Sequence, residues 1–107
     1  MDLEVFWTHF AKAELRNIFD YHKEKASLTI ARKVVNGIYQ ATLRLAEKPA
    51  IGQKEELLIE RPEGFRYLIH TNYKIIYWIN TKSKRVEISD VFDTRQNPVK
   101  IQRNKKY

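Results

Sequence analysis

The chain of 107 residues contains no cysteine. This absence excludes a disulfide framework and any site that depends on a thiolate, and it fits a reducing compartment. The sequence also lacks an apolar run close to the about 20 residues that a membrane span needs. Its first ten residues carry two acids and no basic region ahead of a short apolar run, unlike a signal peptide. We therefore expect a cytoplasmic protein with no membrane contact.

Histidine, glycine and proline are scarce. The three histidines, His9, His22 and His70, are far apart and show no metal-ligand spacing, so we expect neither a metal site nor a cofactor. Only three glycines and three prolines interrupt the chain, and no repeat or low-complexity linker divides it. Its hydrophobic share of 43% is enough for one core at this length. The sequence therefore predicts one domain over residues 1–107.

Basic residues outnumber acidic ones, and the formal net charge is +7. The segment 95–107 has five basic residues and no acid; they are Arg95, Lys100, Arg103, Lys105 and Lys106. A segment of this kind attracts nucleic acid or an acidic protein, or it is a solvated tail with no partner. No feature of the sequence indicates a small-molecule substrate.

Hydrophobic periodicity predicts two helices and four strands. The strands cover residues 3–7, 65–70, 73–79 and 85–92, and the helices run from caps at Thr8 and Ser27 to Ala26 and Lys48. The polar connector 50–64 holds a further candidate strand at 57–59. Consecutive helices followed by a three-stranded meander predict an α+β fold. We expect an antiparallel helical hairpin packed on one face of a mainly antiparallel sheet that includes the N-terminal strand.

The strand at 73–79 is apolar at nearly every position, which indicates burial on both faces. The helical hairpin can cover only one face, so a partner protein or the C-terminal tail must cover the other. Gly37 lies inside the second predicted helix, where it costs about 1 kcal/mol relative to alanine. Close approach of the first helix would explain it.

The last strand has an irregular pattern. Val86 and Ile88 share one face, whereas a regular strand would place Val91 on the opposite face and Asp90 in the core. We therefore expect a β-bulge near Ser89 and Asp90, and bulges often lie beside functional sites.

Five segments in this order resemble the RelE/ParE superfamily of bacterial toxins. They are "AKAELRNIFDY", "LAEKPAIG", "PEGFRYL", "YKIIYWI" and "VEISDVFDTRQNP". The resemblance covers nearly the whole chain. It implies the toxin component of a type II toxin–antitoxin (plasmid stabilisation) module, which inhibits growth until a cognate antitoxin neutralises it. It also implies that an antitoxin segment wraps the toxin and covers apolar grooves and the basic face.

The superfamily divides by mechanism. RelE-like members cleave mRNA on the ribosome, which requires proton transfer and cations that stabilise a charged phosphorane. The positions that match are Arg66, Lys74 and Arg95, with His70 as an outsider that reaches the site only if strand direction allows. Many nuclease members have a basic residue or histidine where this chain has Asp93, and an unpaired carboxylate there repels phosphate. The set of catalytic residues that a RelE-like nuclease needs is therefore incomplete in this sequence.

ParE-like members instead poison DNA gyrase without chemistry of their own, and the long helical hairpin and the "VFDTRQNP" exit favour this branch. A RelE-like mRNA endonuclease and a non-toxic module that only binds antitoxin or nucleic acid remain alternatives. The candidate residues for contact with antitoxin or target are Arg66, Lys74, Tyr77, Trp78, Asp93, Arg95, Gln96, Lys100, Arg103, Lys105 and Lys106.

Overall fold

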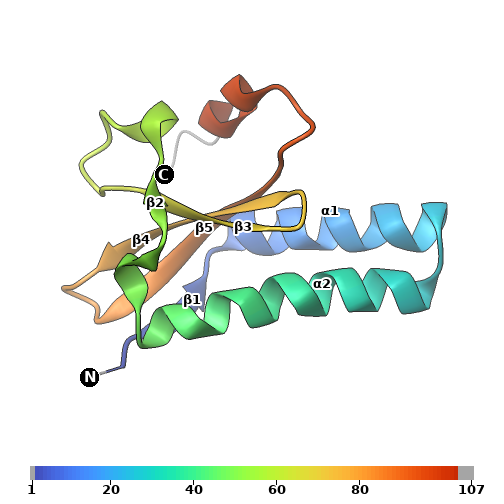
Figure 1. Ribbon diagram of the computed structural model, residues 1–107, viewed down its shortest axis with the longest axis horizontal. Helices are drawn as coiled ribbons and strands as arrows, with labels where there is room; N and C mark the ends of the chain where they lie inside the picture. The colour runs from blue at the N-terminus through green and yellow to red at the C-terminus, as the bar shows by residue number, and fades with distance from the viewer. Residues whose placement is uncertain (1, 104–107) are drawn as a thin grey trace.

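The computed structural model describes residues 2–103 as two helices against one sheet (Figure 1). The α-helices are α1 (His9–Lys25) and α2 (Leu28–Leu43). The strands are β1 (Glu4–Trp7), β2 (Gln53–Lys54), β3 (Arg66–His70), β4 (Tyr73–Asn80) and β5 (Arg85–Asp93). Short 3-10 helices are η1 (Arg44–Ala46), η2 (Pro49–Ile51), η3 (Glu56–Leu58) and η4 (Pro98–Arg103).

The sheet has the order β1-β5-β4-β3-β2. The strands β2 to β5 pair antiparallel, and β1 pairs parallel with β5 after the helical crossover. The expected α+β fold, with the hairpin on one face of a mainly antiparallel sheet, is confirmed. No helix in residues 2–103 has the length and hydrophobicity that crossing a membrane would take.

Both helices begin where the sequence predicts. The Thr8 hydroxyl oxygen accepts a hydrogen bond from Ala11 N at 3.2 Å, and Ser27 Oγ accepts one from Ile30 N at 3.1 Å. The second helix ends earlier than expected, at Leu43, and the chain tightens into η1. The Ala46 carbonyl then accepts a hydrogen bond from Leu3 N at 2.9 Å, so the start of the chain satisfies a carbonyl at this helix end.

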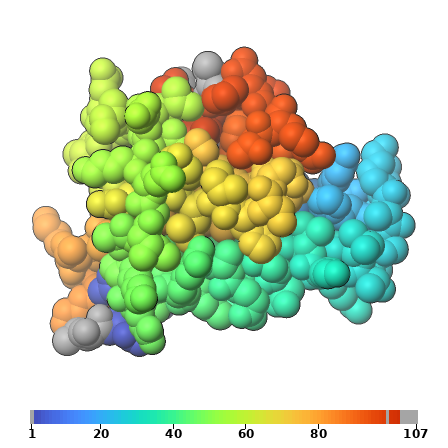
Figure 2. All heavy atoms as spheres, in the orientation of Figure 1, coloured from blue at the N-terminus to red at the C-terminus, as the bar shows by residue number. Residues whose placement is uncertain are grey.

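The sheet separates two cores. The larger core lies between the sheet and the hairpin and includes Ile38, Leu45, Ile75, Tyr77, Val86 and Ile88. The second core lies on the opposite face and consists of Leu58, Phe65, Ile76, Phe92 and Ile101. Ile101 belongs to η4 and is fully buried. Of the two covers expected for the second face, the C-terminal segment is therefore the one that the structure shows, and Figure 2 shows it beside the connector 50–64.

Three details differ from expectation or refine it. The short strand lies at Gln53–Lys54, whereas the predicted strand at 57–59 overlaps η3. Gly37 gives room to β3 and not to α1, because a Cβ atom there would lie 2.8 Å from Nε2 of His70. The expected bulge is confirmed at Ser89, because Ile76 and Tyr77 pair with Asp90 and Ile88 and skip the residue between them.

Candidate functional site

The end of β5 and the residue after it are hydrogen-bonded to the turn between β3 and β4. The Asn72 carbonyl accepts hydrogen bonds from the Thr94 backbone N–H at 2.9 Å and the Thr94 hydroxyl at 2.8 Å. The Asn72 amide in turn donates to Oδ1 of Asp93 at 3.2 Å. The bulge at Ser89 sets the register in which Asp93 pairs with Tyr73 at the start of β4. The backbone of this exit segment is therefore fixed before any partner binds.

Asp93 and Arg95 form a two-point ion pair at this exit. The Arg95 Nη2 donates to Oδ2 of Asp93 at 2.7 Å, and its Nε donates to Oδ1 at 3.0 Å. The Arg95 backbone N–H also donates to Oδ1 at 2.9 Å. These hydrogen bonds lower the pKa of Asp93 to about 2, and the carboxylate raises the pKa of Arg95. Asp93 is therefore not the unpaired carboxylate that the sequence led us to expect.

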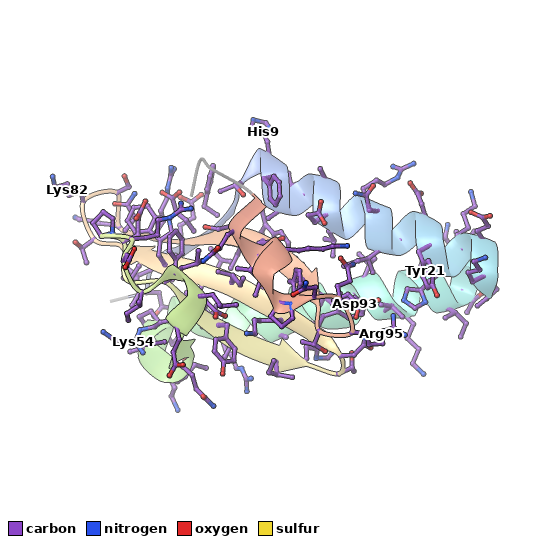
Figure 3. The ribbon with its side chains drawn as sticks, turned by 90° about the horizontal axis from the view of Figure 1, so that it is seen from above. His9, Tyr21, Lys54, Lys82, Asp93 and Arg95 are labelled. Carbon is purple, nitrogen blue, oxygen red and sulfur yellow. The ribbon has the colours of Figure 1, made fainter. Side chains whose placement is uncertain are left out.

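A cavity of about 310 Å³ opens beside this ion pair, between α1 and the end of β5. Tyr21, Tyr73, Asp93 and Arg95 are among its lining residues, and Figure 3 shows Tyr21 on the same side of the molecule as the ion pair. The Tyr73 hydroxyl lies 2.8 Å from Nε2 of His22, which ties α1 to the sheet here. Burial raises the pKa of the Tyr73 hydroxyl, and the nearby Asp93 carboxylate adds to this effect. Sequence reasoning missed Tyr21 and Tyr73 as site residues because they come together only across a helix and a strand.

Lys74 lies on the opposite face of the sheet. Its ammonium donates a hydrogen bond to Oε2 of Glu55 at 2.8 Å and lies 4.2 Å from the centroid of the Tyr67 ring. The Glu55 side chain is only 3% exposed, and its Oε1 accepts a hydrogen bond from Leu57 N. This partly buried ion pair therefore fixes Lys74 to the connector.

Arg66 holds the connector on the helix side of β3. Its Nη1 donates a hydrogen bond to the Gly52 carbonyl at 2.8 Å. Tyr77, a candidate contact residue, is fully buried and donates to the Pro49 carbonyl at 2.6 Å. Burial raises the pKa of this hydroxyl. Arg66 and Tyr77 therefore both hold the segment around η2 in place.

Three of the candidate catalytic residues, Arg66, His70 and Lys74, do not converge. Arg66 and His70 lie at opposite ends of β3, and Lys74 lies on the other face of the sheet. His70 contacts α2 at Gly37, so strand direction does not bring it to Lys74. Within residues 2–103, no three histidine or carboxylate side chains are close enough to hold a metal ion.

The remaining candidates are spread along the C-terminal half. Trp78 packs partly buried against the second core, and Gln96 and Lys100 are exposed. Arg103 ends η4, whereas Lys105 and Lys106 lie outside the described residues. Arg95, Gln96 and Lys100 therefore form a polar surface where the chain leaves the sheet.

An apolar groove between the two helices was not predicted. Its lining includes Trp7, Leu15, Phe19, Val35 and Tyr39, and its volume is about 440 Å³. Lys12, Arg16 and Arg32 lie along this groove and its continuation, and no acidic residue is recorded in either lining. The only signal in the sequence was the helical spacing of the apolar residues. This spacing is the same for an apolar stripe that is fully buried in the core and for one that is only half covered.

A family model described as the ParE toxin of the type II toxin–antitoxin system parDE matches residues 5–98. The chain belongs to the ParE toxin family. The match starts at the second residue of β1 and ends at the first residue of η4, so both α-helices, β2 to β5 and all of β1 except Glu4 of this ParE-family toxin lie within it. Comparison with curated proteins finds no match.

Two solved structures share the fold of this ParE-family toxin. A chain from the chromosomal ParDE system of P. aeruginosa superposes with a TM-score of 0.71 at 20% identity, covering 85% of this chain and 95% of that one. A chain from the toxin–antitoxin complex RelBE2 of Mycobacterium tuberculosis gives a TM-score of 0.56 at 20% identity, covering 87% and 99%. At this identity the likeness establishes the fold.

Proposed function

We propose that this ParE-family toxin inhibits DNA gyrase by binding it, without catalytic chemistry of its own, and that a cognate antitoxin neutralises it. The observation that carries the proposal is the separation of the candidate nuclease residues. Proton transfer needs groups within hydrogen-bond reach of one reacting centre. Lys74 is engaged by Glu55 on one face of the sheet, and Arg66 holds backbone carbonyls on the other.

The hairpin groove supports the antitoxin half of the proposal. An amphipathic helix docks by laying its apolar face in a groove of this kind. Phe19 and Tyr39 offer aromatic surface for such a face, and the cations of Lys12 and Arg32 lie along the groove. A second copy of this chain would bring like charges together, whereas an acidic segment would pair with them. We therefore assign the groove to an acidic, amphipathic antitoxin segment.

The target is tested with purified toxin, DNA gyrase and supercoiled plasmid. We expect toxin to accumulate cleaved plasmid after detergent and protease treatment, and we expect prior mixing with antitoxin to prevent it. A parallel reaction with ribosomes and mRNA, analysed by primer extension, tests the RelE-like alternative. Codon-specific cuts in mRNA together with unaffected gyrase would contradict the proposal.

The groove is tested by co-expressing the toxin with the product of the adjacent reading frame. Tyr39→Asp places a carboxylate in the apolar groove, and we expect it to weaken antitoxin binding by at least about tenfold. Gln40→Asp adds the same charge at the next position, which is exposed and outside the recorded groove lining, so it should leave binding near the wild-type level. Equal losses in the two variants would show that charge alone, and not the groove, controls binding.

A further inference from the structure

The Arg95 guanidinium has one edge occupied and one edge available. Asp93 takes the edge formed by Nε and Nη2, with distances of 3.0 and 2.7 Å. A guanidinium has five donors in a rigid fork, so the edge formed by Nη1 and Nη2 can still bind two acceptors. No described residue is recorded as a hydrogen-bond partner of Nη1, and the Arg95 side chain is 60% exposed. Within residues 2–103, the second two-donor edge of this fixed arginine therefore has no partner.

The charges around Arg95 favour a neutral pair of acceptors over an anion. The Asp93 carboxylate already balances the guanidinium, and Glu14 also lines the cavity. A phosphate or carboxylate placed at the free edge would approach these acidic side chains. The O6 and N7 atoms of guanine are neutral acceptors whose spacing matches the two donors of an arginine. The local electrostatics thus fit a base edge better than a phosphate.

The rest of the cavity suits a planar base. Tyr21 lines it and is 49% exposed, and its ring meets the His22 ring edge-on with centroids 5.2 Å apart. An exposed aromatic ring held in this way provides a surface on which a base can stack. The side-chain amides of Asn17 and Gln96 lie in the same lining and can donate or accept at a base edge. The volume of about 310 Å³ is at the lower end of ligand pockets, which span about 300–1,000 Å³.

We propose that this cavity binds an unpaired guanine of a single-stranded nucleic acid, with Arg95 contacting O6 and N7 through its free edge and Asp93 acting as the positioning residue. A base inside a duplex could not enter a cavity of this kind, so the strand must be single or locally open. The net charge of +7 contributes sequence-independent attraction to the phosphates. This inference concerns a second binding property of the toxin, and it stands or falls separately from inhibition of gyrase.

The test measures binding of the full chain to fluorescent 12-mers of thymidine that carry one central guanine, adenine or 7-deazaguanine, with matching ribonucleotide strands. Fluorescence anisotropy at fixed salt gives each Kd. Loss of N7, or replacement of O6 by an amino group, should weaken binding about tenfold, which corresponds to about 1.4 kcal/mol. A guanine preference in either the DNA or the RNA series supports the proposal, and the stronger series identifies the source of the base.

Three variants separate the arginine contact from general charge. Arg95→Lys keeps the charge but loses the two-donor edge, so the preference for guanine over 7-deazaguanine should fall to about onefold. Asp93→Asn should reduce this preference while overall affinity stays or rises, because the lost carboxylate repels phosphate. Lys82→Ala removes a cation from the opposite end of the molecule (Figure 3), so it should lower affinity for every strand equally. Thermal melting of each variant is the control that tests whether the chain remains folded.

Three results would overturn the proposal. One is equal affinity for guanine, adenine and 7-deazaguanine, which leaves only phosphate attraction. Another is a guanine preference that survives in Arg95→Lys. The third is an absence of binding to all strands while an acidic peptide binds at Arg95, which would assign the free edge to a protein carboxylate. None of these results depends on the gyrase reaction.

Discussion

The ion pair between Lys74 and Glu55 should contribute to stability and not to toxicity. Glu55 is 3% exposed and Lys74 18% exposed, with 2.8 Å between Nζ and Oε2. Lys74→Met keeps most of the length of the side chain but removes the cation. The Glu55 carboxylate would then keep only the hydrogen bond from Leu57 N, in a place that water hardly reaches.

The expected cost follows from the burial of the carboxylate. Removing one partner of a buried ion pair costs about 3–5 kcal/mol, because the other charge remains unpaired. Lys74 keeps some contact with water, so we expect the lower end, about 3 kcal/mol. For a domain near this size, about 3 kcal/mol lowers Tm by roughly 12–20 °C. Loss of the cation over the Tyr67 ring, 4.2 Å from its centroid, is part of this total.

A double-mutant cycle in urea measures the coupling directly. Glu55→Gln alone should also destabilise, whereas the double variant with Lys74→Met should recover to within about 1 kcal/mol of wild type, since no unpaired buried charge remains. Lys54→Met is the matched control on an exposed site of β2, with an expected change within about 0.5 kcal/mol.

Two outcomes would refute this reasoning. Additive single-variant effects, with a coupling below about 0.5 kcal/mol, would mean that the two side chains do not depend on each other. Loss of toxicity in Lys74→Met at unchanged Tm would mean that the lysine acts on the target and that its place in the fold is secondary.

Asp93 and the two glycines next to the β-sheet give three further expectations. Because the folded pKa of Asp93 is about 2, below the ordinary value, its stabilisation is complete above about pH 4 and is lost as pH falls through 2. Partial exposure of the pair limits this loss to about 1 kcal/mol, and Asp93→Asn should reduce the difference in the free energy of urea unfolding between pH 5 and pH 2 by about that amount, while the other acidic residues keep their share of it. Gly52→Ala should cost about 2 kcal/mol, since its Cβ would lie 2.5 Å from the Tyr77 hydroxyl and 2.7 Å from a backbone carbonyl. Gly37→Ala should change the unfolding free energy by less than about 0.5 kcal/mol, because it meets only the movable His70 ring and gains helix propensity; equal Tm values for the two alanine variants would contradict the contrast.

Periodic features of this protein were predictable from the sequence. The caps at Thr8 and Ser27 each depend on one side chain and a backbone N–H three residues away. Both partners therefore lie within one short stretch of sequence. The bulge at Ser89 was visible because alternation fails at one residue, and the structure shows the pairing shift there. The prediction of two buried faces for β4 also required a cover, which the C-terminal segment supplies through Ile101.

Contacts made by irregular segments were not predictable. Glu55 is 19 residues from Lys74 and lies in a connector without periodicity, so no pattern links them. Arg66 has backbone carbonyls as partners, and a sequence of side chains does not reveal which carbonyls a loop will expose. The groove between the two helices was not predictable for another reason. Phe19 and Tyr39 have the spacing of core residues, and only the three-dimensional packing shows that nothing in the described chain covers them fully.

Asp93 shows how one residue can support the same conclusion for a different reason. As an unpaired carboxylate it would repel phosphate, but the structure pairs it with Arg95 and Asn72. With a pKa of about 2 it stays ionised near neutral pH, where an efficient acid or base needs a pKa near the working pH. It also balances the charge of Arg95, which a nuclease would need for the phosphorane. Asp93 therefore argues against RNA cleavage by neutralising the arginine and by remaining unprotonated, and both effects are consistent with a toxin that acts by binding.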